Sequence, residues 1–435
     1  MSADKHFSAT EDSELSYKIH LILLTGQLLM ENGADTNRIV RDLKRIAAYM
    51  CIPDDNLRLH IMYNTLIVSV SDRTHTKTSV GKCQKHINNM DAIASISRLT
   101  WKIIEDNLPL DVYEKELLEI QGRPKLYPTA LACIGAGVAC GALSHLFGGD
   151  IPAALCTFLA ACIGFSLRII TDQYEVNPYA SISLATFIST FFAWFIQFFS
   201  GSTTPWHPML ACALFFIPGL PLINAVDDML NNHIVAGLTR ACDTLIIVGS
   251  VTFGIILTIR LCQVTDVIKL NVMPESFFIL QPLAACFVAM GYSLTFNVPK
   301  KIIPLAGLCA IICLAVRNFL NIEIGAGLCA STFAGAATVS VISLIASRHF
   351  KIPTHVLSIP SVTPLMPGVH LYRTLFALIN IKSLTGPALL ISIQTGIEAV
   401  LTVIGMAVGV AVPNLIARHY LDKEKREHLK ELLDK

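Results

Sequence analysis

The chain has 435 residues, of which 53% are hydrophobic and 15% are charged. Soluble domains carry about 25% charged residues, so this composition excludes an ordinary soluble protein and indicates a membrane protein. The formal net charge of +1 gives no reason to expect nucleic acid as a partner. Polar residues gather in residues 1–127 and 417–435, whereas residues 128–416 are mostly apolar.

Residues 1–127 show the periodicities of a small cytoplasmic α/β domain. Apolar residues recur at helical spacing in four segments, and three others carry the alternating or β-branched residues typical of strands. The expected elements are helices at 15–33 and 36–50, strands at 57–61, 65–70 and 76–80, and helices at 90–104 and 112–120. No signal peptide precedes this polar region, so we expect the N-terminus to stay in the cytoplasm.

The same region contains no nucleophile–base pair, phosphate loop or metal-ligand spacing. His60, His75 and His86 are isolated in the sequence, and the 13 cysteines of the chain include no Cys-x-x-Cys pair. We therefore expect no enzyme activity, no catalytic residue, no metal site and no cofactor.

The apolar region predicts a polytopic α-helical membrane protein. A span needs about 20 mostly apolar residues, and ten segments fit, five in residues 128–265 and five in residues 266–416. The expected spans are 129–147, 151–170, 178–199, 207–226 and 238–261, then 277–296, 302–320, 325–346, 355–379 and 387–412. Residues 417–435 are expected to form a charged cytoplasmic tail.

The two halves match at a constant offset. Arg317 follows Arg168 by 317 − 168 = 149 residues, and Pro367 follows Pro218 by 367 − 218 = 149. Further pairs at this offset are Phe147 with Phe296, Leu159 with Leu308, Ala161 with Ala310, Ile163 with Ile312, and Gly237 with Gly386. A shared register over roughly 90 residues indicates an internal duplication. Because five is odd, the second copy must be inverted, which is typical of secondary transporters.

Basic residues favour a cytoplasmic position for both termini. In this orientation the inner segments hold Lys125, Lys300 and the basic tail, while the outer loops 148–150 and 200–206 carry no basic residue. The exceptions, which would fall outside, are Arg260, Lys269, Arg317 and Lys382.

The fourth span of the first half holds the first group of candidate site residues. Polar groups at membrane depth are costly, so each is a functional candidate. Pro218 and Gly219 should break the helix, and Asn224, Asp227 and Asp228 follow the break. An aspartate here would carry a proton or pair with a substrate ammonium group. The alternative is that both aspartates lie at a helix end in the headgroup region.

The fourth span of the second half repeats the break. Pro367 and Gly368 interrupt it, and His370 and Arg373 follow. Two broken helices at equivalent positions point to a binding site at the bilayer midplane. Arg373 would pair with a substrate carboxylate, or else lie among the headgroups.

The remaining candidates are single polar residues. Gln394 and Glu398 lie one turn apart in the otherwise apolar last span, where a charged residue has few structural explanations. The secondary candidates are Arg168, Arg317, Arg240 and Asp243. Arg168 and Arg317 have the alternative interpretation of anchors that reach the membrane surface.

Together these motifs resemble the threonine/serine exporter family over almost the whole chain. The residues that carry the resemblance are 28–34 (Leu-Leu-Met-Glu-Asn-Gly-Ala) with Arg38, 88–104, 108–120, 216–228, 236–240 (Ala-Gly-Leu-Thr-Arg) and 365–368 (Leu-Met-Pro-Gly). The resemblance implies a proton-driven exporter of small polar metabolites in a bacterial inner membrane.

The expected function is therefore proton-coupled export of threonine or serine by alternating access. Two-chain relatives are similar to succinate exporters, so export of succinate or another dicarboxylate is the alternative. A membrane-anchored hydrolase is a third reading, but it requires clustered catalytic groups that the sequence does not show. The expected partners are a small-molecule substrate, protons and the lipid bilayer, with a homo-oligomer as a further option.

Overall fold

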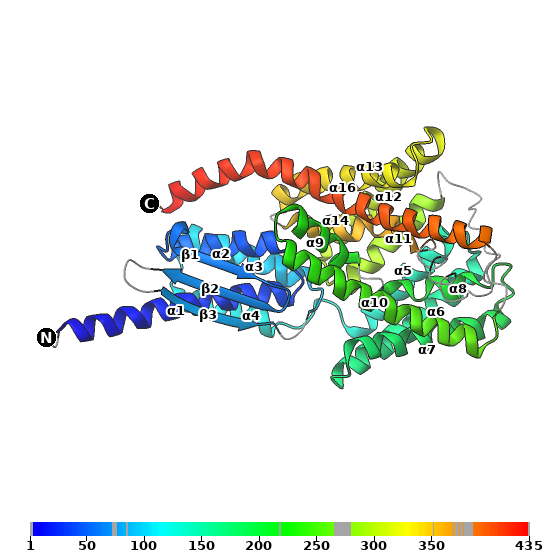
Figure 1. Ribbon diagram of the computed structural model, residues 1–435, viewed down its shortest axis with the longest axis horizontal. Helices are drawn as coiled ribbons and strands as arrows, with labels where there is room; N and C mark the ends of the chain where they lie inside the picture. The colour runs from blue at the N-terminus through cyan, green and yellow to red at the C-terminus, as the bar shows by residue number, and fades with distance from the viewer. Residues whose placement is uncertain are drawn as a thin grey trace.

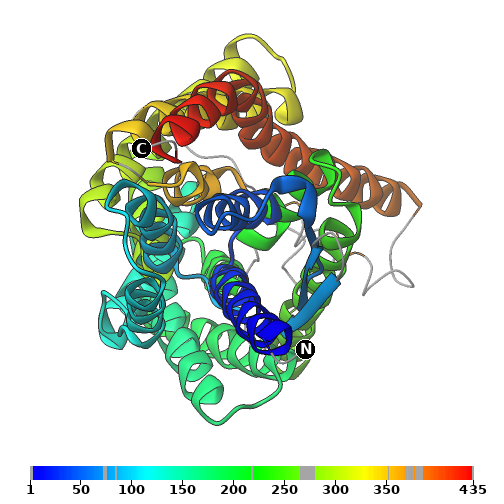
Figure 2. The same cartoon turned by 90° about the vertical axis from the view of Figure 1, so that its left-hand side faces the viewer.

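The computed structural model describes residues 3–71, 76–83, 86–216, 219–264, 280–350, 352–368, 370, 374, 377 and 386–433. The protein is helical, with one small sheet near the N-terminus. Figure 1 shows the first four helices and the sheet at one end of the long axis, and the apolar helices at the other. Viewed from the sheet end, this N-terminal domain lies in front of the centre of the helix bundle (Figure 2).

The N-terminal domain has the elements that its periodicity predicts. They are α1 (Ala3–Glu31), α2 (Thr36–Tyr49), β1 (Leu57–Ile61), β2 (Thr65–Ser71), β3 (Thr76–Lys82), α3 (Met90–Glu105) and α4 (Leu110–Gly122). The strands are antiparallel in the order β1-β2-β3, and Leu66, Val68 and Val70 of β2 point into the core. The prediction of a small α/β unit is confirmed, although α1 begins earlier than expected.

The described residues after 122 are almost entirely helical. Its elements are α5 (Thr129–Leu146), α6 (Ile151–Gln173), α7 (Pro178–Ser200), α8 (His207–Ala211), η2 (Leu214–Phe216), α9 (Gly219–Leu230), α10 (Ile234–Leu261), α11 (Leu280–Thr295), η4 (Lys300–Ile302), α12 (Ile303–Asn318), η5 (Phe319–Glu323), α13 (Leu328–Phe350), α14 (Thr354–Val362), η6 (Thr363–Leu365) and α16 (Gly386–Leu433). We call these the membrane helices.

Seven segments within the described residues are long and apolar enough to cross a membrane, so the chain is a multi-pass membrane protein. They are Thr129–Leu146, Ile151–Gln173, Pro178–Ser200, Ile234–Leu261, Lys300–Glu323, Leu328–Phe350 and Leu389–Ala417. The pair His207–Phe216 and Gly219–Leu230, bent by 52°, makes an eighth if it counts as one span.

The expected count of ten spans is therefore not reached. The segment at 277–296 appears as α11, which has 16 residues, and 277–279 lie outside the described residues. The segment at 355–379 appears as the short helix α14 and a 3-10 turn, and most of its remainder is also outside them. The arrangement as five plus five inverted spans stays a prediction.

The elements nevertheless recur with the spacing found in the sequence. The 3-10 turn η6 begins 363 − 214 = 149 residues after η2, and the helical segment at Lys300 begins 300 − 151 = 149 after α6. Helices α5 and α11 pack closely, because a side chain at Gly291 would clash with the backbone of Gly135 and Ala139. Close approach of this kind is how helices associate in membranes, where small residues replace the hydrophobic effect.

The last helix runs through the boundary expected between the second half and the charged tail. Helix α16 is 48 residues long and continues to Leu433 without a break at 416–417. Its backbone leaves the membrane helices and ends beside the N-terminal domain, so that both chain ends lie at the same end of the molecule (Figure 1).

Candidate functional site

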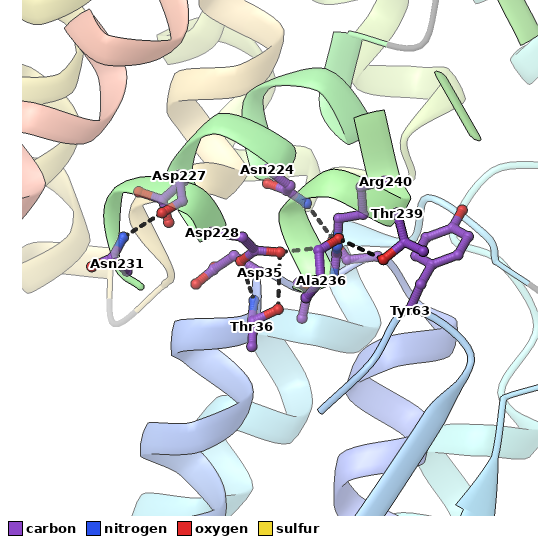
Figure 3. A network of polar contacts seen from close by, with 12 residues as sticks. Asp35, Thr36, Tyr63, Asn224, Asp227, Asp228, Asn231, Ala236, Thr239 and Arg240 are labelled. Atoms are coloured by element: carbon purple, nitrogen blue, oxygen red, sulfur yellow. Dashed lines mark hydrogen bonds and ion pairs between the residues drawn. The ribbon is translucent and has the colours of Figure 1, made fainter. Parts of the chain in front are cut away.

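The first turn of α2 lies where the N-terminal domain meets the membrane helices. Gly33 has φ +89°, a conformation that favours glycine, and it turns the chain between α1 and α2. Asp35 then caps α2, because its Oδ1 accepts a hydrogen bond from the Arg38 amide at 2.8 Å. The turn and the cap together point Asp35 and Thr36 at α9 (Figure 3).

Asp228 of α9 is the centre of the contact. The Thr36 amide and hydroxyl donate to its two carboxylate oxygens, each at 2.9 Å, and Arg240 Nε of α10 lies 3.1 Å from Oδ2. The Asp228 and Arg240 side chains are buried. A charge pair that is buried and hydrogen-bonded in this way costs about 3–5 kcal/mol to break by removal of one partner. Asp228 therefore fastens the N-terminal domain to the membrane helices.

Two further candidates hold the same turn from the membrane side. Arg240 Nη2 donates to the Ala34 carbonyl at 3.0 Å, and Asn224 Nδ2 donates to the Gly33 carbonyl at 3.1 Å. Asn224, Asp228 and Arg240 thus lie together around one backbone turn, as Figure 3 shows.

Asp227 lies in a second cluster, which draws on three parts of the chain. Asp35 of the N-terminal domain, Asp227 of α9 and His355 of α14 have their ligand atoms within 4.8 Å of one another, and all three are buried. His355 Nε2 is 3.7 Å from Asp35 Oδ2, and Arg38 Nε is 3.3 Å from the same oxygen. Carboxylate and imidazole groups at these distances could hold a cation between the N-terminal domain and both halves of the membrane part.

Asp243 takes part in a separate docking contact. Tyr63, in the turn between β1 and β2, donates to Asp243 Oδ2 at 2.8 Å, and Tyr179 of α7 donates to Oδ1 at 2.6 Å. Burial raises the pKa of Tyr63, and the nearby charge of Asp243 raises it further, so the phenol keeps its proton and remains a donor.

The two helix breaks meet inside the molecule. A side chain at Gly219 would clash with the methyl group of Met366, and a Cβ at Gly368 would lie 3.0 Å from Leu214 Cδ2. The Tyr292 hydroxyl of α11 donates to the Leu214 carbonyl at 2.9 Å and satisfies a backbone group next to the break. Pro367 is buried in the second break, whereas Pro218 lies outside the described residues.

The candidates in the last helix are placed elsewhere. Gln394 and Glu398 line a cleft of about 960 Å³ between α13 and α16, and Glu398 Oε2 is 4.0 Å from His370 Nε2. Arg373 lies outside the described residues. Among the described residues, Glu398 is not a member of the Asp35–Asp227–His355 cluster.

Arg168 and Arg317 make local contacts near the ends of their helices. Arg168 pairs with Asp172 at 3.0 Å and donates to the Pro178 carbonyl, while Arg317 donates to Asn318 at 2.8 Å. The interpretation of both residues as helix-end anchors stays a prediction.

Sequence reasoning missed four residues that contribute to these clusters: Asp35, Thr36, His355 and Tyr63. The pair Asp35–Thr36 after a glycine carries a capping signal that would have placed it at a helix start. Nothing in the local sequence places His355 or Tyr63 near the aspartates, because their partners are more than 100 residues away.

Comparisons with known proteins agree with this architecture. Residues 20–262 match the family model described as "Putative threonine/serine exporter", and residues 281–416 match "Threonine/Serine exporter, ThrE". The "Threonine/serine exporter" of Corynebacterium glutamicum is 24% identical, over 94% of this chain and 84% of its own length. The "Probable threonine/serine exporter" of Mycobacterium tuberculosis is 22% identical, over 82% of this chain and 69% of its own.

A relative that is named as a succinate transporter subunit matches a smaller part of this chain. The "Probable succinate transporter subunit YjjP" of Escherichia coli (strain K12) is 25% identical, over 55% of this chain and 93% of its own length. No solved structure matches the chain. The first family model alone spans more than half of the residues. The chain therefore belongs to the threonine/serine exporter family of membrane transporters.

Proposed function

We propose that this protein exports a small amino acid, threonine or serine, across a bacterial inner membrane in exchange for protons. The substrate follows the names of the two exporters that match most of the chain. The cycle is alternating access between two inverted five-span halves, with both chain ends in the cytoplasm. The recurrence of η2 and η6 and the meeting of the two breaks support two related halves.

The observation that carries the substrate class is a group of buried carboxylates. Asp35, Asp227 and Asp228 are buried where the N-terminal domain meets the membrane helices, and Arg38 pairs with Asp35 and Arg240 with Asp228. Buried carboxylates favour a ligand with an ammonium group, because opposite charges offset each other's desolvation. A dicarboxylate such as succinate would meet repulsion from these carboxylates.

Flux measurements with purified protein in lipid vesicles test this function. Vesicles loaded with labelled threonine, serine or succinate are followed with and without an imposed proton gradient. We expect gradient-dependent movement of threonine and serine, and little movement of succinate. Movement of succinate alone would support the dicarboxylate alternative suggested by the Escherichia coli relative. If no substrate moves more than in empty vesicles, the exporter function is wrong.

Three substitutions locate the coupling group among the acidic candidates. Asp227→Asn, Asp228→Asn and Glu398→Gln each remove one charge with little change of volume. We expect Asp227→Asn to abolish gradient-driven flux and Asp228→Asn to act mainly through loss of the domain contact. Unchanged flux in all three variants would remove these residues from the transport site.

A further inference from the structure

Three buried polar side chains lie at the end of the membrane helices far from the N-terminal domain. They are Ser144 of α5, Gln197 of α7 and His207 of α8, which are 0%, 7% and 7% exposed. The Ser144 hydroxyl, the Gln197 side-chain oxygen and both ring nitrogens of His207 have no hydrogen-bond partner among the described residues. Buried polar groups nearly always have a partner, because an unsatisfied group loses its hydration without compensation. These three side chains therefore point to a partner from outside the chain.

The three side chains converge on one place. Their helices surround a single buried apolar cluster, whose members include Cys140 of α5, Ala193 of α7 and Leu210 of α8. Ser144 and Gln197 each follow a member of this cluster by four residues, and His207 precedes one by three, so each shares a helix face with that member. Helices α5 and α7 run away from the N-terminal domain and α8 runs back, and Figure 1 shows α8 at the far end of the molecule. All three polar side chains therefore lie on the far side of the cluster.

The loop between α7 and α8 is fastened beside these side chains. Asp150, at the start of α6, accepts hydrogen bonds from the Ser202 hydroxyl at 2.7 Å and from the Thr203 amide and hydroxyl at 2.7 Å and 2.9 Å. The Asp150 amide donates to Thr204 Oγ1 at 3.0 Å. Although burial raises the pKa of Asp150, the hydrogen bonds that it accepts lower this pKa well below the ordinary value. The carboxylate therefore stays ionised at neutral pH and keeps the loop in place.

His207 is the member of the group that can change its charge. Histidine is the side chain that ordinarily exchanges a proton between pH 5 and 8, whereas serine and glutamine stay neutral. The backbone carbonyl groups of Phe147 and Thr204 lie near its ring, although not in hydrogen-bonding geometry, and add two acceptors to the site. A proton on the ring would therefore have acceptors close by.

The other titratable groups around His207 are engaged or distant. His145 of α5 has a partner, because its Nδ1 lies 2.9 Å from the Gly149 carbonyl oxygen. Helix α7 carries no charged residue, and the thiols of Cys140 and Cys212 belong to the apolar cluster. Within the described residues, the charged groups of α6 and α10 lie near the other end of the molecule or are exposed: Arg168, Asp172, Arg240, Asp243 and Arg260. His207 is therefore the proton-accepting group that fits the site.

Water is the partner that fits this set of donors and acceptors. A serine hydroxyl donates and accepts, the glutamine oxygen accepts, and a neutral imidazole does one of each at its two nitrogens. Buried water molecules make about three hydrogen bonds each to such groups. Among the described residues, a metal ion would find no free carboxylate at this site, since Asp150 is bound to the loop. The transported amino acid would lack a partner of opposite charge for its ammonium or carboxylate group.

We propose that Ser144, Gln197 and His207 form a hydrated proton site at the outer end of the protein, where His207 takes up the proton that enters in exchange for the exported amino acid. This rests on the proposed function and on its orientation, with both chain ends in the cytoplasm. Water in the site delivers a proton to one imidazole nitrogen and an imidazolium ion forms. The imidazolium ion returns the proton to water after access has changed to the cytoplasmic side. This uptake precedes the step assigned to the acidic candidates near the N-terminal domain.

Flux in lipid vesicles tests the proton uptake. His207→Gln keeps a polar side chain that can bind water but cannot take up a proton. It should keep exchange of labelled for unlabelled threonine within about threefold of the wild type, because exchange moves no net proton. Gradient-driven accumulation should fall at least about tenfold. His145→Gln, at the same end of the molecule, is the matched control and should keep both activities.

Thermal unfolding in detergent tests the hydration without relying on flux. Gln197→Leu replaces the buried side-chain oxygen by an apolar group of similar size. If water satisfies this oxygen, the variant loses those hydrogen bonds, and we expect its melting temperature to fall below that of the wild type. Gln173→Leu, at the exposed last residue of α6, is the control and should melt with the wild type. A higher melting temperature for Gln197→Leu would show that the oxygen is unsatisfied, and it would overturn the hydrated site.

The outcomes of the flux assay separate the two proposals. Gradient-driven accumulation by His207→Gln at the level of the wild type would overturn the proton site while the exporter function stands. Loss of exchange together with accumulation would assign His207 a structural role and also overturn the site. A wild-type protein that neither exchanges nor accumulates an amino acid would overturn the exporter function itself.

Discussion

The two helix breaks share a backbone interruption but differ in the charges around them. Asp228 follows the first break, and the residue 377 − 228 = 149 positions later is Ala377. His355 precedes the second break, and the residue 355 − 149 = 206 is a tryptophan, Trp206. The interruption recurs at the spacing of 149 residues, whereas the buried carboxylates Asp227 and Asp228 follow the first break, where the N-terminal domain docks. Positions that correspond in spacing therefore carry different chemistry in the two parts of the chain.

Substitution of Arg240 should give the largest loss of stability. Arg240→Met keeps the side-chain volume but leaves Asp228 buried without its cation, which should lower the free energy of unfolding by about 3–5 kcal/mol. The N-terminal domain should also detach more readily, and trypsin should cut faster at the exposed Lys125. Thermal unfolding and timed proteolysis in detergent measure both. Arg348→Met, at an exposed end of α13, is the control, and equal behaviour of the two variants would show that docking does not depend on the ion pair.

Larger side chains at the two breaks should give an intermediate loss of stability. The loss should be equal at the first break and at the second. Gly219→Val and Gly368→Val press on Met366 and Leu214, and overpacking of this kind costs about 1–3 kcal/mol. Transport should fall in both variants. Gly249→Val is the control, because a Cβ there meets nothing within 4 Å. Sensitivity at only one of the two breaks would contradict a shared geometric role.

Removal of one docking hydrogen bond should have a smaller effect. Tyr63→Phe takes away one of the two phenols that donate to Asp243 and leaves Tyr179 in place. The expected loss is about 1 kcal/mol of unfolding free energy, measured by thermal unfolding. Tyr174→Phe, at a residue that is 79% exposed, should change nothing. A Tyr63 variant as stable as the Tyr174 variant would remove this contact from the docking surface.

Low pH should give the smallest loss of stability, at the end of the molecule where the N-terminal domain docks. Burial lowers the pKa of His233 in the folded protein. The unfolded chain therefore binds a proton at a higher pH than the folded protein, and stability falls as the pH drops below about 6.5, the ordinary histidine value. The melting temperature of the wild type should fall more between pH 8 and pH 5 than that of His233→Asn. Parallel curves would exclude His233 as a contributor.

Much of the fold could be predicted because it follows from local patterns. Helical periodicity and alternating strands located the elements of the N-terminal domain, and apolar length located the seven spans. The breaks were predictable because proline and glycine act on their own backbone. The count of ten is not reached among the described residues where a span is bent or short, since hydropathy measures composition and not the path of the chain.

The candidate site was predictable only in part. Asp227 and Asp228 stood out as charges in an apolar segment, yet nothing in the sequence distinguished their roles. In the structure, Asp228 contacts Thr36 and Arg240, whereas Asp227 lies near Asp35 and His355. Adjacent residues on a helix point about 100° apart, so their partners depend on what packs on each side.

The sequence by itself determined that this chain is a membrane protein, and it predicts two related, interrupted halves behind a small α/β domain. These properties depend on hydropathy, spacing and backbone chemistry, which act over short stretches. Only the tertiary structure decided that the N-terminal domain reaches into the membrane part and adds Asp35 to its buried charges. That contact joins residues more than 190 positions apart. Electrostatic balance in a buried site depends on the sum of all nearby charges, and the order of residues along the chain does not reveal that sum.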